Sequence, residues 1–131
     1  MNKYYLFLDD IRLPSDVRWV KLPECPWTII RNYSEFRNTI LYLGIPEFVA
    51  YDHDLSDMHY GHGLKDDEID YNKYTEKTGY DCCQFLLNQC NNKGIKHPPY
   101  VVHSMNPVGA SNIRKIIDSY NRTVKYLKKE I

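Results

Sequence analysis

The sequence predicts an α/β fold built around a short, mainly parallel sheet of four strands. Four short apolar runs occur along the chain, and segments with the spacing of amphipathic helices follow three of them. The strand-like runs are residues 4–8, 27–30, 48–51 and 100–102. Strands that alternate with helices are typical of parallel sheets joined by right-handed crossovers. We expect a single domain over residues 1–131, since this length supports one hydrophobic core.

The first half of the chain contains a buried strand, an irregular connection and a helix. The run Tyr4–Leu8 is almost continuously apolar, as in a strand that is covered on both faces. Residues 12–26 contain three prolines and no helical period, so irregular structure is expected there, with room for a short edge strand around residues 17–20. Ser34 is a suitable N-cap for the helix that follows the second strand, and Gly44 is a suitable C-cap.

The second half of the chain repeats the pattern with longer helices. The strand at Phe48–Tyr51 precedes residues 54–78, a polar and tyrosine-rich stretch that is long for a connection and is expected to form a lid or binding loop. A helix is expected over Gly79–Lys93. A final helix begins near residues 107–111 and has apolar side chains at helical spacing: Ile113, Ile116, Ile117, Tyr120, Val124 and Leu127.

The composition is that of a globular protein with no overall charge. Apolar residues make up 43% of the chain and charged residues 26%, which argues against disorder. The 17 basic and 17 acidic residues cancel, so broad binding to nucleic acid is not expected. No apolar run approaches the roughly 20 residues that span a bilayer, so no membrane partner is expected either. The oligomeric state is left open.

The four cysteines are expected to be reduced thiols in structural positions. They are Cys25, Cys82, Cys83 and Cys90. No pair has the C-x-x-C spacing that is typical of zinc ligands. Unpaired structural thiols are typical of reducing compartments, which predicts a cytoplasmic location.

Acidic residues follow two of the predicted strands at the point where each strand ends. Asp9 and Asp10 follow the first run, and Asp52 and Asp54 follow the third. The carboxyl ends of neighbouring parallel strands meet in one crevice, where carboxylates repel one another unless a cation or shared protons hold them. We therefore expect Asp9, Asp10 and Asp52 to bind a divalent metal, with magnesium, manganese or calcium favoured over zinc. The alternative for Asp9 and Asp10 is a solvated turn.

Two histidines stand beside these carboxylates at predicted strand ends. His53 lies between Asp52 and Asp54, and His103 follows the fourth run. Imidazole titrates near neutral pH, so both residues are candidates for moving a proton to or from water or a leaving alkoxide. The alternative is that each histidine is structural and held by hydrogen bonds.

A polar run that leads into the last helix is a candidate phosphate site. Its members are Ser104, Asn106, Gly109 and Asn112. A helix amino terminus offers free backbone N–H groups and a positive potential, which suit a phosphate. The alternative is an ordinary capping region.

Four motifs occur in order along the chain: Leu8–Pro14 (LDDIRLP), Tyr51–Leu55 (YDHDL), Thr78–Asp81 (TGYD) and His103–Gly109 (HSMNPVG). Taken together, they resemble the cyclic-phosphate-processing receiver domain family, a divergent branch of the response-regulator receiver fold. The resemblance implies a flavodoxin-like, receiver-like three-layer sandwich with an acidic metal pocket.

In ordinary receivers an acidic pair after the first strand and an aspartate after the third bind magnesium and accept a phosphoryl group. By resemblance, Asp9 and Asp10 match the pair, Asp52 best matches the third-strand aspartate, and Ser104 matches the fourth-strand hydroxyl. Asp52 is thus a candidate catalytic residue, as a metal ligand, a nucleophile or both. The chain lacks a recognisable fifth strand with the usual lysine, so phosphorelay signalling is not expected.

Two functions are consistent with these observations. The first is a metal-dependent hydrolase, with Mg²⁺ or Mn²⁺ as cofactor, that acts on a cyclic phosphate of a nucleotide or ADP-ribose-like molecule. In it, His53 and His103 share the acid and base roles. The second is a non-catalytic module that binds a nucleotide or phosphate, or that docks a protein. Turnover of a cyclic phosphate distinguishes the two.

Overall fold

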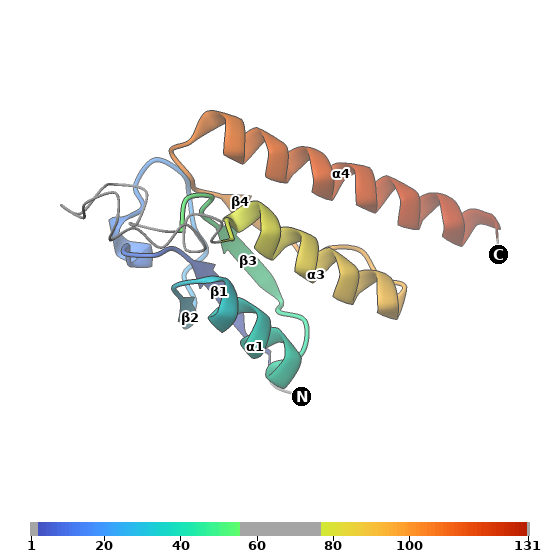
Figure 1. Cartoon of the computed structure of the whole chain (residues 1–131), viewed down its shortest axis with the longest axis horizontal. Helices are drawn as coiled ribbons and strands as arrows, with labels where there is room; N and C mark the ends of the chain where they lie inside the picture. The colour runs from blue at the N-terminus through green and yellow to red at the C-terminus, as the bar shows by residue number, and fades with distance from the viewer. Residues whose placement is uncertain (1–2, 56–76, 131) are drawn as a thin grey trace, which may run out of the picture.

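A four-stranded parallel sheet forms the centre of the structure, a computed structural model that describes residues 3–55 and 77–130. Its strands are β1 (Tyr5–Leu8), β2 (Trp27–Ile30), β3 (Phe48–Tyr51) and β4 (Tyr100–Val102). They are hydrogen-bonded in the order β2-β1-β3-β4, and all three pairs are parallel (Figure 1). The predicted α/β class is therefore confirmed.

The register of the strands brings the ends of three strands to the same level. Leu8 pairs with Tyr51, and Tyr51 pairs with Val102. The next residue of each strand is Asp9, Asp52 or His103, and each of the three is buried. The carboxyl edge of the sheet therefore carries two acids and a histidine side by side.

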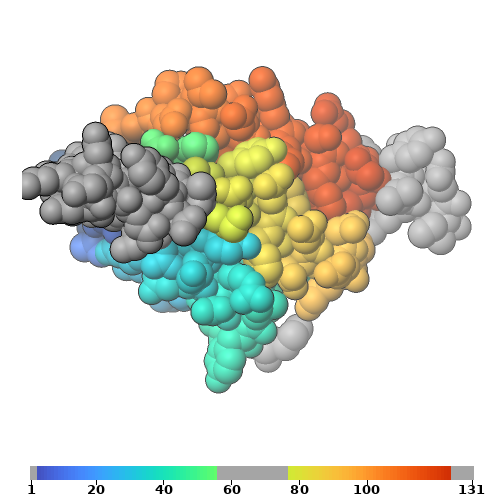
Figure 2. Space-filling model, in the orientation of Figure 1, coloured from blue at the N-terminus to red at the C-terminus, as the bar shows by residue number. Residues whose placement is uncertain are grey.

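Three helices cover one face of the sheet. They are α1 (Tyr33–Leu43), α3 (Gly79–Lys93) and α4 (Pro107–Glu130). Figure 2 shows α3 lying between α1 and α4. The main core is formed by strand side chains together with one face of each helix: Leu6, Leu8, Val49, Tyr51, Phe36, Ile40, Cys83, Leu86, Ile113 and Ile117.

The opposite face of the sheet is covered by the irregular connection between β1 and β2. This segment contains a 3₁₀ turn, η1 (Pro14–Asp16). Val17, the residue after this turn, packs on Phe7 and Ala50. The expectation of irregular structure over residues 12–26 is confirmed, but the edge strand expected around residues 17–20 is not formed, because Val17 packs onto the face of the sheet. The third layer thus consists of irregular chain, because three prolines in this stretch prevent a helix.

The helix ends follow the expected capping chemistry with one difference. Asn32 is the N-cap of α1, since its side chain accepts a hydrogen bond from the Glu35 N–H at 2.9 Å. The prediction of Ser34 as N-cap was wrong, because α1 already begins at Tyr33, so that Ser34 lies inside the first turn and the extended Asn32 is the cap. Gly44 ends α1 with φ 90°, as predicted. Thr78 and Asp81 form a capping box at the start of α3.

The four cysteines are free, and the three that α3 carries are buried. The expectation of unpaired thiols is therefore confirmed. In the described part of the chain, no helix has both the length and the apolar character needed to cross a membrane. The lid expected at residues 54–78 falls almost wholly on residues 56–76, which lie outside the described residues.

Candidate active site at the carboxyl edge of the sheet

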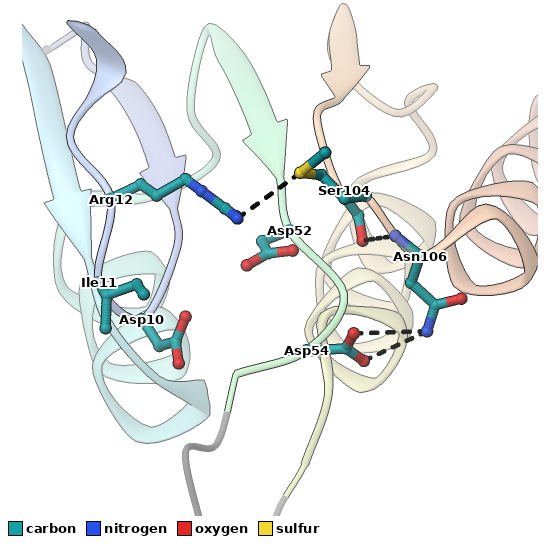
Figure 3. Close-up of a pocket in the computed structure, with 8 residues that line it drawn as sticks. Asp10, Ile11, Arg12, Asp52, Asp54, Ser104 and Asn106 are labelled. Carbon is teal, nitrogen blue, oxygen red and sulfur yellow. Dashed lines mark hydrogen bonds between the residues drawn. The ribbon is translucent and has the colours of Figure 1, made fainter. Parts of the chain in front are cut away.

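A cavity of about 320 Å³ opens at the carboxyl edge of the sheet (Figure 3). Its walls come from the loops after β1, β3 and β4. The lining residues are Asp10, Ile11, Arg12, Asp52, Asp54, Ser104, Met105 and Asn106. Acidic side chains from two different strand ends therefore face a single space, as the sequence predicted.

Asp52 is a nearly buried carboxylate that lines this cavity. Its side chain is 4% exposed, and its Oδ1 accepts a hydrogen bond from the His53 N–H at 2.8 Å. Burial raises the pKa of Asp52 to about 6, and the negative charges of Asp9 and Asp10 act in the same direction. The site therefore opposes the ionised form of Asp52 unless positive charge is supplied.

Asp9 lies behind Asp52 and is fully buried. Its Oδ1 accepts hydrogen bonds from the backbone N–H groups of Ile11 and Arg12 at 3.0 and 2.8 Å, and its Oδ2 lies 3.0 Å from Nε2 of His103. Burial acts to raise the pKa of Asp9, but these hydrogen bonds outweigh burial and lower it to about 2. Asp9 is therefore ionised at neutral pH, and it does not itself line the cavity.

His103 is held deep in the structure rather than at the cavity wall. Its ring is fully buried and stacks on Phe7, with centroids 4.8 Å apart and planes at 2°. Its Nδ1 has no hydrogen-bond partner among the described residues. The structure thus brings His103 to Asp9 and places it behind the cavity, where it can orient Asp9.

The donor atoms at this edge fit a divalent cation. One ligand atom each from Asp9, Asp52 and His103 lie within 4.8 Å of one another, so these three buried residues could form a metal site. Asp10 and Asp52 also line the same cavity. Burial raises the pKa of Asp52, with the charges of Asp9 and Asp10 acting in the same direction, and a bound cation would offset both effects. Asp52 is therefore common to both possible sets of metal ligands, the buried set with Asp9 and His103 and the cavity-lining set with Asp10.

A second polar network occupies the opposite wall of the cavity. Nδ1 of His53 lies 2.8 Å from Oδ1 of Asp54, and the Asn106 side-chain amide donates to both Asp54 oxygens at 3.3 and 3.4 Å. Asp54 is 44% exposed, whereas His53 is 18% exposed and does not line the cavity. Asp54 and Asn106 are therefore the members of this network that face the cavity.

Two glycines allow helices to approach the end of β3. A Cβ on Gly79, the first residue of α3, would lie 1.7 Å from the backbone oxygen of Asp52. A Cβ on Gly109, in the first turn of α4, would lie 2.3 Å from Cγ of His53. Glycine is thus required at both positions for Asp52 and His53 to keep their places.

The candidate phosphate residues separate into two groups. Ser104 and Asn106 line the cavity, and the hydroxyl of Ser104 accepts a hydrogen bond from the Asn106 N–H at 3.1 Å. The Gly109 N–H instead donates to Oδ1 of Asn106 at 3.0 Å. Asn112 lines a separate surface depression with Tyr80 and Lys115, apart from the cavity. Asn106 therefore caps α4, as the capping alternative states, and also forms part of the cavity wall.

Four residues that line the cavity were not among the site residues expected from the sequence: Ile11, Arg12, Asp54 and Met105. Arg12 is the single basic side chain among the described residues that line the cavity. Its Nη1 lies 3.5 Å from Oδ2 of Asp9, and its backbone oxygen accepts a hydrogen bond from Arg31 at 2.7 Å. The signal was present, since Arg12 stands inside the Leu8–Pro14 motif.

Comparison with known families agrees with this geometry. The model of the cyclic-phosphate processing receiver domain matches residues 4–119, which include every strand and every residue of the cavity. The chain belongs to this family. No curated protein and no solved structure matched the chain. Membership of this family links the chain to the processing of cyclic phosphates. It also confirms the receiver-like fold that the motifs predicted.

Proposed function

We propose that this receiver is a metal-dependent hydrolase that opens a cyclic phosphodiester on a nucleotide or ADP-ribose-like molecule. The observation that carries the proposal is the composition of the cavity. Three carboxylates, one guanidinium, one hydroxyl and one amide face the same space of about 320 Å³. Such a combination suits a phosphate ester, a divalent cation and a water molecule together.

The ligand roles follow from the position of each side chain. Asp10 and Asp52 would hold the cation, with the buried charge of Asp9 close behind them. The cation would neutralise charge on the phosphoryl group when bound. Arg12 and the Ser104 hydroxyl would contact the remaining phosphoryl oxygens, since guanidinium and hydroxyl groups donate hydrogen bonds to phosphate.

The reaction needs one proton removed and one proton delivered. The water oxygen forms a new bond to phosphorus, one ring P–O bond breaks, and the leaving oxygen takes a proton from solvent water to become a hydroxyl. Asp54 is placed to accept the proton of the water, because it lines the cavity and is oriented by His53 and Asn106. The product is a phosphate monoester.

This assignment redistributes the roles that the sequence suggested. His53 and His103 become positioning residues, which orient Asp54 and Asp9 respectively. Asp52 becomes a cation ligand. Ser104 and Asn106 remain as phosphate contacts, whereas Gly109 and Asn112 are left out because neither lines the cavity.

Turnover of defined cyclic phosphates tests the proposal. The purified protein is incubated with Mg²⁺ or Mn²⁺ and a nucleoside 2′,3′-cyclic phosphate or an ADP-ribose cyclic phosphate, and mass spectrometry detects the gain of one water. Asp54→Asn should lower the rate by about 10²–10⁴, the usual cost of removing a general base. Asp118→Asn, an exposed aspartate on α4, is the matched control and should turn over normally.

Other outcomes identify other functions. Binding of the cyclic phosphates with no turnover under either metal would favour the non-catalytic module. A stable adduct on Asp52 after incubation with acetyl phosphate and Mg²⁺ would return the protein to phosphorelay signalling. We expect no such adduct, because the described residues that line the cavity include no lysine, the residue that contacts the acyl phosphate in ordinary receivers.

A further inference from the structure

Two apolar side chains line the cavity without a role in binding phosphate or metal. Ile11 is 70% exposed and Met105 is 66% exposed, and both line the same space as the carboxylates. A single exposed apolar side chain needs no explanation. Two of them, from loops after different strands and at one polar cavity, indicate a surface that a ligand covers.

The two residues stand on different walls. Figure 3 shows Ile11 and Asp10 across the cavity from Ser104 and Asn106. Met105 lies between Ser104 and Asn106 in the chain and belongs to the loop after β4. A ligand anchored at the carboxylates would therefore pass between an apolar side chain from the β1 loop and another from the β4 loop.

The wall that carries Met105 is braced by a chain of contacts. Nη2 of Arg12 lies 3.8 Å from the sulfur of Met105, and the Arg12 guanidinium lies 5.2 Å from the centroid of the Trp19 ring. The indole N–H of Trp19 donates to the backbone oxygen of His103 at 2.7 Å. Contacts of this kind orient a side chain before the ligand arrives, which lowers the entropy lost on binding.

The chemistry of these walls favours a flat, uncharged ring. Methionine sulfur and a planar guanidinium both make favourable contacts with aromatic rings. A ligand that carried a second anionic group in place of such a ring would be repelled by the carboxylates that line the cavity. The volume of about 320 Å³ also lies in the range of small-molecule sites, roughly 300–1,000 Å³, and exceeds what a phosphate group alone fills.

We propose that Ile11 and Met105 are specificity-determining residues that contact the base of a nucleoside cyclic phosphate. The inference rests on the proposed function and adds to it the part of the substrate that the protein selects. These two side chains would distinguish nucleoside cyclic phosphates, which carry a base, from cyclic phosphates of simple polyols, which carry none.

Affinities for two ligands test the assignment in the intact protein. Isothermal titration calorimetry in Mg²⁺ measures Kd for uridine 2′,3′-cyclic phosphate and for glycerol 1,2-cyclic phosphate, which lacks the base. Every protein compared, including the one with the native residues at positions 11, 105 and 108 that serves as wild type, carries Asp54→Asn so that neither ligand is consumed during the titration. The wild-type protein should bind the uridine compound about tenfold or more tightly. Met105→Ser and Ile11→Ser should each reduce this preference about fivefold or more, with Kd for the glycerol compound unchanged.

Val108→Ser is the matched control. Val108 is 71% exposed in the first turn of α4 and does not line the cavity, so its substitution should leave both Kd values unchanged. All three substituted positions are exposed, so circular dichroism should report an unaltered fold. Loss of the preference in Val108→Ser to the same extent would contradict the assignment.

The remaining outcomes separate this inference from the proposed function. Equal affinity of the wild-type protein for the two ligands would overturn the roles of Ile11 and Met105 and leave the cyclic-phosphate function in place. Binding of neither ligand, with no turnover, would overturn the proposed function and this inference with it.

Discussion

Asp52 is a carboxylate with 4% of its surface exposed, and Asp9 and Asp10 lie close enough to oppose its ionisation. Its pKa of about 6 lies above the ordinary value of 3.8, so the folded protein binds this proton more tightly than the unfolded chain. At neutral pH the ionised side chain therefore destabilises the metal-free protein. A bound cation would reverse this effect.

Asp52→Asn should separate these two effects. In EDTA at neutral pH the variant should be more stable than the wild-type protein by about 1–3 kcal/mol, because a neutral amide replaces a strained charge. Its melting temperature should no longer rise when Mg²⁺ or Mn²⁺ is added, whereas that of the wild-type protein should rise by mass action. Thermal melts with EDTA and with each metal measure both quantities.

Asp118→Asn again serves as the control, since Asp118 is an exposed residue on α4. It should respond to metal as the wild-type protein does. An Asp52→Asn variant that still responds fully to metal would show that Asp52 is not a ligand.

Among the helices, α3 and α4 each place a glycine against the end of β3. The Gly79 N–H donates to the backbone oxygen of His53 at 2.7 Å, so α3 is anchored directly to the residue that follows Asp52. Helix propensity alone favours alanine over glycine by about 1 kcal/mol inside a helix. Steric overlap decides the outcome here, because the added Cβ has no space at either position.

Gly79→Ala should destabilise the protein by about 2–4 kcal/mol, since the overlap is with backbone atoms that cannot rotate away. Gly109→Ala should lower the free energy of unfolding by less, because the added Cβ overlaps a side-chain ring, which can move. The substitution should displace His53 and thereby lower the rate of turnover. Urea denaturation and turnover measure the two effects. Gln84→Ala, at an exposed position of α3, is the control and should be nearly neutral. A stabilised Gly79→Ala variant would contradict the close approach.

At the scale of the whole molecule, His97 and Asp52 are buried titrating groups that act on stability in opposite directions between about pH 4 and pH 6.5. His97 is 6% exposed, its Nε2 lies 2.7 Å from the Tyr51 hydroxyl, and its Nδ1 lies 2.6 Å from the backbone oxygen of Pro98. Burial lowers the pKa of His97 from 6.5 to about 4. The unfolded chain therefore binds this proton at higher pH, and stability falls as pH drops through that interval.

Asp52 has the opposite sign. The folded protein binds its proton at higher pH than the unfolded chain, so stability rises as pH drops from about 6 to 3.8. Each effect is on the order of 3 kcal/mol, since one pKa unit corresponds to about 1.4 kcal/mol. In metal-free wild-type protein the two contributions should largely cancel over this interval.

Two variants should reveal the separate contributions. In EDTA, His97→Gln should gain stability relative to the wild-type protein as the pH is lowered through the interval, and Asp52→Asn should lose it. Urea denaturation at several pH values measures the difference, and the other titrating groups cancel in the comparison. Parallel pH profiles for both variants and the wild-type protein would contradict this account.

Local sequence was sufficient to predict the class of the fold and the strand ends that meet. The apolar runs at 4–8 and 48–51 predicted buried strands, and Asp9, Asp10 and Asp52 were placed at one edge because parallel strands end on the same side. Gly44 marked the end of the first helix through the backbone chemistry of capping. These features depend on neighbours in the chain, which a sequence displays directly.

The tertiary structure alone decided which of these side chains face the cavity. His103 and Asp9 follow their strands as Asp52 does, yet packing against Phe7 and the β1 loop buries both of them behind it. Arg12 and Met105 are far apart in sequence and meet only because β1 and β4 flank β3. Burial and contact between distant segments set these roles, since both depend on how the crossovers pack and not on any local pattern.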